Sequence, residues 1–152
     1  MKVNRRKFIK STLVLTTAGM ALFDSAATNA QWDAADFAPN PFDAAMKQLL
    51  NGKPIVETDK IEMNIPEIAE NGALVPVTVT SSLKDIQNIA IVVEQNPVPL
   101  TLQAVLMPEL EPFISARLKL ANTSFVYAIA ETEKICYSVK KKVKVTIGGC
   151  GG

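Results

Sequence analysis

The chain has 152 residues, 48% of them hydrophobic, and a formal net charge of +1. This length predicts one globular domain together with whatever is removed in processing. The sequence contains no histidine, which excludes His-dependent catalytic triads and removes the commonest general base and metal ligand.

Residues 1–30 have the pattern of an export signal. A basic start with two adjacent arginines precedes an apolar run from about Leu13 to Phe23, and small residues follow, as signal peptidase requires. The run is too short for a membrane anchor, which needs roughly 20 apolar residues. Residues 4–10, Asn-Arg-Arg-Lys-Phe-Ile-Lys, resemble the twin-arginine motif of bacterial export, which usually has Ser or Thr first and Leu after Phe. We therefore expect a periplasmic protein with a twin-arginine signal at residues 1–30.

The twin-arginine pathway exports proteins that are already folded, often with a cofactor or a bound partner. Because the sequence shows no cofactor or metal motif, we expect a partner that lacks its own signal. Removing residues 1–30 takes five of the 16 basic residues and one of the 15 acidic ones, which leaves 11 and 14 and a net charge of −3. This charge argues against binding of nucleic acid.

A short helix is predicted near residue 40. Asn40 is a suitable N-cap, Pro41 suits the first helical position and Asp43 favours the positive end of the helix dipole. Gly52 and Pro54 are expected to end the helix. We expect its apolar face to pack on the domain, with partner binding as the alternative; this face has helical spacing and consists of Phe42, Ala45, Met46, Leu49 and Leu50.

Beyond the helix, apolar residues recur at every second position, which predicts strands. The run Ile89–Val93 is apolar throughout and predicts a strand buried on both faces. Asn71-Gly72 and Asn122-Thr123 mark turns. Seven short strands in series predict an all-β, immunoglobulin-like antiparallel β-sandwich with a short N-terminal helix. The strands are centred on residues 61–65, 75–79, 89–93, 100–106, 114–120, 124–130 and 137–147.

The final predicted strand alternates apolar residues with lysines. Lys140, Lys142 and Lys144 share the phase that faces solvent, whereas Lys141 falls in the apolar phase and predicts a bulge or an edge position. Lysines on an edge strand commonly do no more than block aggregation. The alternative is that the three ammonium groups attract anions and favour the thiolate of Cys150, modestly, because exposed charges are screened beyond about 8 to 10 Å.

The chain ends in Gly148-Gly149-Cys150-Gly151-Gly152. Glycine makes a flexible chain, and ordering this stretch would bury almost nothing. An ordinary cysteine has a pKa near 8.5, and nothing among the flanking glycines activates it. We therefore predict a flexible arm at residues 148–152, mounted on a domain of residues 31–147, whose Cys150 accepts groups from separate enzymes.

Cys136 is the other thiol, and we expect it to be a buried core residue, as free cysteine usually is. Pairing with another thiol is the alternative for Cys136. A disulfide between Cys136 and Cys150 is one such pairing, because the expected compartment is oxidising.

Several stretches of the sequence carry a family likeness: the terminal Gly-Gly-Cys-Gly-Gly, Ile68–Ala73 with Val75-Pro76-Val77, Asn96-Pro97, Ser115–Ala121 and Val143–Thr146. Over about residues 40–152 the chain resembles the SoxY family, the sulfur-carrier subunits of bacterial thiosulfate-oxidising Sox systems. A twin-arginine signal is usual in this family.

The resemblance implies an immunoglobulin-like sandwich without a resident cofactor, paired as a heterodimer with a SoxZ-like subunit that lacks a signal. A haem c enzyme would couple thiosulfate oxidatively to the sulfur of Cys150, and a hydrolase would release sulfate and leave a persulfide. In some organisms a sulfane dehydrogenase would oxidise the remaining sulfur. The expected function is thus a covalent carrier of thiosulfonate and persulfide groups, not an enzyme, with no nucleic-acid or membrane partner. Ile89–Val93 and the final strand are our guesses for the partner interface.

Two other functions fit parts of the pattern. Gly151-Gly152 could carry sulfur as a thiocarboxylate after adenylation, but the expected export places the chain in a compartment without ATP. Alternatively, the protein is a structural periplasmic sandwich domain whose Cys150 forms an interchain disulfide.

Overall fold

The computed structural model describes residues 37–146. The predicted signal peptide, Ile147 and the arm with Cys150 lie outside the described residues, so the domain boundaries at residues 30 and 147 stay predictions. Within the described part, no helix is both long enough and apolar enough to cross a membrane.

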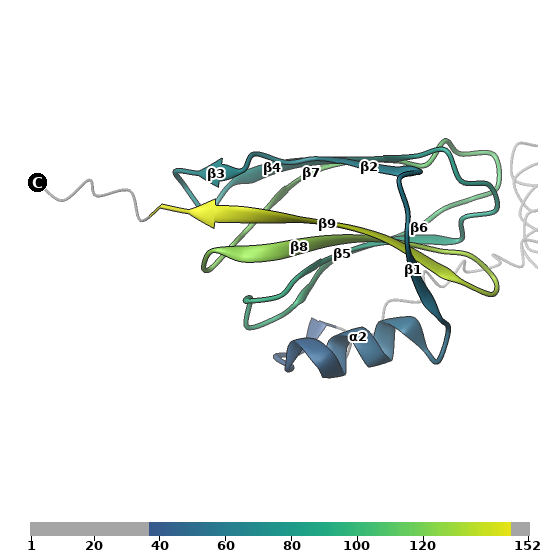
Figure 1. Ribbon diagram of the computed structural model, residues 1–152, viewed down its shortest axis with the longest axis horizontal. Helices are drawn as coiled ribbons and strands as arrows, with labels where there is room; N and C mark the ends of the chain where they lie inside the picture. The colour runs from purple at the N-terminus through teal and green to yellow at the C-terminus, as the bar shows by residue number, and fades with distance from the viewer. Residues whose placement is uncertain (1–36, 147–152) are drawn as a thin grey trace, which may run out of the picture. The chain divides into compact units, whose positions relative to one another are not determined.

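The described residues form two facing sheets (Figure 1). The larger sheet has the order β1-β9-β8-β5-β6, with β3 also pairing with β9, and the smaller has the order β2-β4-β7. Neighbouring strands are antiparallel, except that β1 and β3 both run parallel to β9. The strands are β1 (Ile55–Glu57), β2 (Ile61–Asn64), β3 (Ile68–Ala69), β4 (Val75–Ser81), β5 (Asn88–Val93), β6 (Leu100–Val105), β7 (Phe113–Leu118), β8 (Ser124–Glu131) and β9 (Cys136–Val145).

The predicted fold class is confirmed, and all seven predicted strands are present. The sequence prediction missed β1 and β3. They contain three and two residues, which is too short for an alternation to be recognised. Each is held by parallel pairing with β9 at one end of that strand, a contact that depends on tertiary structure and not on local pattern.

The main hydrophobic core lies between the two sheets. Alternate residues of β4 point into it, so that Val75, Val77 and Val79 are buried. Along β5, the side chains of one phase enter this core while those of the other phase enter a second cluster on the opposite face of the sheet. The prediction that Ile89–Val93 is buried on both faces is therefore confirmed. This burial also rules out Ile89–Val93 as a partner interface.

Helix α2 (Phe42–Leu50) covers the outer face of the larger sheet (Figure 1). Its predicted apolar face packs inward, and the Phe42 ring lies 5.3 Å from the Tyr127 ring, centroid to centroid. The expectation that this face packs on the domain is thus confirmed. The cluster beneath the helix consists of Ala90, Val92, Leu100, Ile129 and Cys136.

The helix begins one residue later than the sequence predicts. Pro41 is the N-cap, with ψ of 144°, and no side chain caps the helix. The predicted cap, Asn40, instead donates its N–H to the Pro97 carbonyl at 3.3 Å. At the other end Asn51 adopts the left-handed conformation that closes many helices, and Gly52 follows with φ of 79°.

Candidate functional site

The C-terminal end of β9 is the candidate site, because the predicted arm follows it directly. In Figure 1, β9 extends away from β1 and ends beside β3. Its pairing with β8 runs without a break from Cys136 opposite Glu131 to Val143 opposite Ser124. The predicted arm therefore follows a strand whose pairing with β8 is continuous.

Val145 and Thr146, which we call the arm root, are held by neighbours on several sides. The Thr123 hydroxyl accepts a hydrogen bond from the Val145 N–H at 3.0 Å, and the Thr146 N–H donates to the Ala69 carbonyl at 3.0 Å. A Cβ on Gly72 would lie 2.9 Å from the Val145 Cγ1 atom. The turn motifs at Gly72 and Thr123 thus have a positional role that the sequence analysis missed.

The segments that carry the family likeness meet around this root, although they are far apart in the sequence. The Asn96 side chain donates to the Lys119 carbonyl at 2.7 Å and accepts from the Ala121 N–H at 2.9 Å. The Leu120 N–H donates to the Gly72 carbonyl at 2.7 Å. A hypothetical Gly72 Cβ would lie only 2.5 Å from the Leu120 carbonyl oxygen, so this close approach requires glycine. These segments form one connected support for the end of β9.

The lysines of β9 have the predicted phases. Lys140, Lys142 and Lys144 are exposed on the outer face. Lys141 makes no bulge, since the register with β8 is continuous; it is exposed on a stretch of β9 whose other edge has no strand partner among the described residues. The bulge alternative is therefore wrong and the edge alternative is correct.

The electrostatic surroundings of these lysines differ. The Lys140 ammonium lies 2.8 Å from the Glu57 carboxylate, whose hydrogen bond and charge raise the pKa of Lys140. The Lys142 ammonium lies 5.8 Å from the centroid of the Phe125 ring, within the range of a cation–π contact. The attraction of anions by Lys140, Lys142 and Lys144 stays a prediction, and Lys140 has a local counter-charge.

Cys136 lies at the opposite end of β9 and is a free thiol with 1% of its surface exposed. It packs in the cluster beneath helix α2. Burial raises the pKa of Cys136, and the nearby Glu131 carboxylate acts in the same direction. The prediction of a buried core position is confirmed, and a raised pKa keeps this thiol protonated and unreactive.

The length of β9 rules out the Cys136–Cys150 disulfide. Val145 lies nine positions after Cys136 along the strand, which is about 30 Å at about 3.3 Å per residue. Cys150 lies five positions after Val145, which spans at most about 18 Å even when fully extended. The two sulfur atoms therefore cannot meet while β9 is formed.

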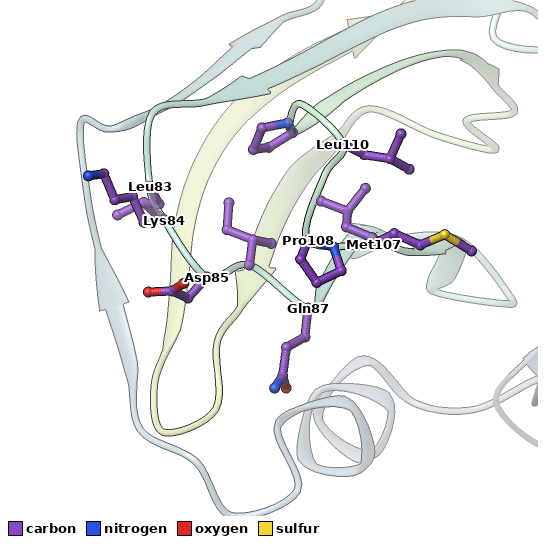
Figure 2. A pocket seen from close by; sticks show the side chains of 10 residues that line it. Leu83, Lys84, Asp85, Gln87, Met107, Pro108 and Leu110 are labelled. Carbon is purple, nitrogen blue, oxygen red and sulfur yellow. The ribbon is translucent and has the colours of Figure 1, made fainter.

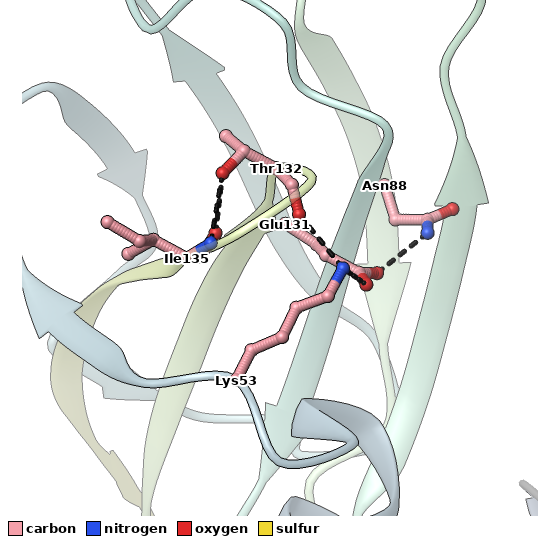
Figure 3. Close-up of polar contacts among 5 residues, drawn as sticks. All are labelled: Lys53, Asn88, Glu131, Thr132 and Ile135. Atoms are coloured by element: carbon pink, nitrogen blue, oxygen red, sulfur yellow. Dashed lines mark hydrogen bonds and ion pairs between the residues drawn. The ribbon is translucent and has the colours of Figure 1, made fainter.

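A polar network closes the Cys136 end of the domain (Figure 3). The Lys53 ammonium contacts Glu131 Oε1 at 2.6 Å and the Thr132 carbonyl at 2.9 Å, and the Asn88 amide donates to Glu131 Oε2 at 2.7 Å. The hydrogen bond with Glu131 raises the pKa of Lys53. The network ties the segment after helix α2 to β5 and β8, over sequence separations that no local pattern reveals.

A hollow of about 490 Å³ lies between the loop after β4 and the loop after β6 (Figure 2). Its lining combines apolar side chains, including Ile86, Met107 and Leu110, with polar groups, and Lys84 and Asp85 are its charged members. Across residues 37–146, no three His, Cys, Asp or Glu side chains gather in a way that could hold a metal ion. The hollow therefore offers space but no cluster of acid–base or ligating groups.

Comparison with known proteins identifies the family. Residues 46–150 match a family model described as "Sulfur oxidation protein SoxY". A solved structure, that of the sulfur carrier protein SoxY from Chlorobium limicola f thiosulfatophilum, is similar with a TM-score of 0.64 and 35% identity, covering 69% of this chain and 96% of that one. A search of curated proteins found no match. Because the family model spans well over half of its length, the chain belongs to the SoxY family of sulfur oxidation proteins.

Proposed function

We propose that this protein is a covalent sulfur carrier in thiosulfate oxidation, and that Cys150 holds the sulfur. The observation that carries the proposal is the family match, which extends along the chain as far as residue 150. The solved SoxY structure is itself described as a sulfur carrier protein. Separate enzymes load and unload the thiol, and the protein itself is not a catalyst.

The chemistry at Cys150 has two balanced steps. In the first, the outer sulfur of thiosulfate bonds to the Cys150 sulfur, one proton leaves the thiol, and two electrons pass to a haem c enzyme. In the second, a hydrolase adds water at the sulfonate sulfur and the bond between that sulfur and the outer sulfur breaks. Sulfate and one proton leave, the other proton of the water goes to the outer sulfur, and a persulfide remains on Cys150. A sulfane dehydrogenase, where one is present, oxidises this persulfide further.

The geometry of the arm root supports this role. The root is held by Thr123, Ala69 and Gly72, so the starting point of the arm is fixed relative to the domain. From Val145 the arm can extend at most about 18 Å to Cys150. A fixed start and a bounded reach let the thiol enter a narrow active site while the sandwich stays outside.

The proposal includes a SoxZ-like partner subunit and a periplasmic location reached by twin-arginine export. The described surface offers room for a partner, because several large apolar side chains are exposed near the loop between β6 and β7. These are Val105, Met107, Leu110 and Phe113. Burial of such apolar surface is a common source of stability in subunit association.

The test is direct loading of the thiol. The chain is incubated with thiosulfate and the haem c coupling enzyme, and intact and peptide masses are recorded before and after a reducing agent. We expect a reducible adduct on the Cys150 peptide, no adduct for Cys150→Ser, and normal loading for Cys136→Ala, whose missing thiol is buried.

Two results would contradict the carrier role. One is thiosulfate oxidation that continues unchanged with Cys150→Ser in a reconstituted system. The other is a single fixed disulfide partner on Cys150 in place of sulfur adducts, which is the outcome expected for a structural sandwich domain.

A further inference from the structure

The edge of β9 that faces away from β8 is hydrogen-bonded near both ends of the strand. In the middle of the strand this edge has no partner among the described residues. β1 pairs with residues 136–138 and β3 pairs with Lys144 and Val145. Between them, residues 139–143 have no partner strand on this side within the described part of the chain. We call this stretch the β9 window; at about 3.3 Å per residue it is about 16 Å long.

The backbone groups that face the window belong to Lys140 and Lys142. On the same edge, the Ser138 carbonyl accepts a hydrogen bond at 3.0 Å from the residue after β1, and the Lys144 N–H donates at 2.8 Å to the segment before β3. Backbone groups alternate between the two edges of a strand, so the even-numbered residues face this side. The window therefore presents two N–H donors and two carbonyl acceptors without a backbone partner in residues 37–146.

The surroundings of the window carry positive charge. A groove of about 760 Å³ extends from the window to the end of β9, and it is lined by Lys141, Lys142 and Lys144 together with Ile65, Glu67, Ile68 and Thr123. Three ammonium groups thus face one carboxylate. A second copy of this chain would bring the same lysines to the window and be repelled, so the charge selects an acidic partner.

We propose that the β9 window is a docking site for a short, extended, acidic segment of a partner protein, which adds as a strand between β1 and β3. This inference rests on the proposed function, because the partners concerned are the enzymes that act on the arm. The segment pairs with the backbone of Lys140 and Lys142, and acidic side chains at alternate positions meet Lys142 and Lys144. Ile68, which is 58% exposed, supplies an apolar contact, as is usual in strand addition.

The position of the window gives this docking a purpose. The window ends two residues before Val145, so a protein docked there lies beside the arm root. Its active site then needs to open within about 18 Å of the root for Cys150 to enter it. Strand addition at the window would thus hold an enzyme at the distance that the arm can cover.

The test uses nuclear magnetic resonance on the isotope-labelled Cys150→Ser chain and a blocked tetrapeptide of alternating glutamate and threonine, which at about 3.3 Å per residue fits within the window. We expect the amide signals of Lys140 and Lys142 to shift most, and the shifts to vanish with the same peptide N-methylated at alternate residues. The Lys142→Gln and Lys144→Gln double variant should bind about fivefold more weakly, because exposed charge pairs contribute modestly. The matched double variant Lys47→Gln and Lys84→Gln, on exposed lysines elsewhere, should bind as the parent does.

Unmoved amides of Lys140 and Lys142 would overturn the inference, as would equal shifts with the N-methylated peptide, which would indicate a charged surface without strand addition. Because the Cys150→Ser chain cannot carry sulfur, this experiment is independent of the loading test. Failure here would leave the carrier function standing, and failure of loading would leave peptide binding at the window unaffected.

Discussion

Helix α2 covers the outer face of β9 at the strand's beginning, whereas the outer face is open to solvent at its end. Cys136 and Ser138 are 1% and 5% exposed, while Lys140, Lys142 and Lys144 belong to the same phase and are exposed. The strand geometry is the same in both halves. The cover decides whether a position belongs to the core or the surface, and it also decides the chemistry of a thiol placed there. Cys136 beneath the helix is buried and its pKa is raised, whereas the availability of Cys150, which follows the open end, stays a prediction.

Thiol labelling gives the largest expected contrast between the two ends. At pH 8, Cys136→Ala, which retains Cys150, should react with iodoacetamide about 1,000-fold faster than Cys150→Ser, which retains Cys136. Labelling of Cys136 requires local opening that costs several kcal/mol, and each 1.4 kcal/mol is a factor of ten. Rates are followed by mass spectrometry, and both variants should react alike in urea. A native ratio below tenfold would show that the helix does not seal the cluster around Cys136.

The next largest expected effect is a loss of stability when the packing at the arm root is disturbed. Gly72→Ala places a methyl group 2.5 Å from the Leu120 carbonyl oxygen and 2.9 Å from Val145, and we expect it to lower the free energy of unfolding by about 2 kcal/mol. Gly52→Ala is the matched control, because it has open space but a φ of 79° and should cost about 1 kcal/mol. Urea unfolding measures both. A Gly72→Ala chain as stable as the control would mean that the root is not closely packed.

The parts that sequence predicted well are those with a repeated local pattern. The alternation of Val75, Val77 and Val79 and the unbroken apolar run of Ile89–Val93 were enough to predict strands and their burial. The apolar face of helix α2 was found in the same way. The predicted start of the helix was one residue too early, because Pro41 has an extended ψ and cannot be the first helical residue here.

The parts that sequence missed depend on contacts between distant segments. β1 and β3 exist through pairing with β9. The bond between Lys53 and Glu131 joins residues 78 positions apart. At the candidate site, the glycine-flanked Cys150 and the phase of the lysines were visible in the sequence, whereas the support of the root by Thr123 and Gly72 was not.

Removal of the Thr123 hydroxyl at the arm root should lower the stability by a smaller amount. Thr123→Val removes the acceptor for the Val145 N–H, and we expect a loss of about 1 kcal/mol in stability together with faster hydrogen exchange at the Val145 amide. Thr123→Ser keeps the hydroxyl and should restore slow exchange. If the serine variant exchanged as fast as the valine variant, the hydrogen bond would not be what holds the root.

The smallest expected effect is a dependence of the unfolding free energy on pH, caused by the buried Cys136 at the covered end of β9. Burial raises the pKa of Cys136 above the value near 8.5 of an unfolded chain, so the protonated thiol favours the folded state. The stabilisation from the protonated Cys136 thiol is complete below about pH 8.5. It is lost as the pH rises through the pKa that Cys136 has in the folded protein. Unfolding free energies between pH 8 and 10 should therefore decline for the parent and stay flatter for Cys136→Ala. Lys53 and Lys140 do not interfere, because their raised pKa values lie above 10.5. Equal slopes would show that Cys136 does not titrate with unfolding.

The place of β9 in the sheet has a consequence for biosynthesis. β9 is the last of the described strands to be translated, yet it lies between β8 and β1 and also pairs with β3. Until it emerges from the ribosome, the larger sheet is open between β1 and β8, and closure then requires pairing across most of the domain, which is slow. Translation that stops ahead of β9 would therefore produce a chain with an unclosed core, which the cell's quality control can recognise, and not a folded domain that merely lacks its arm.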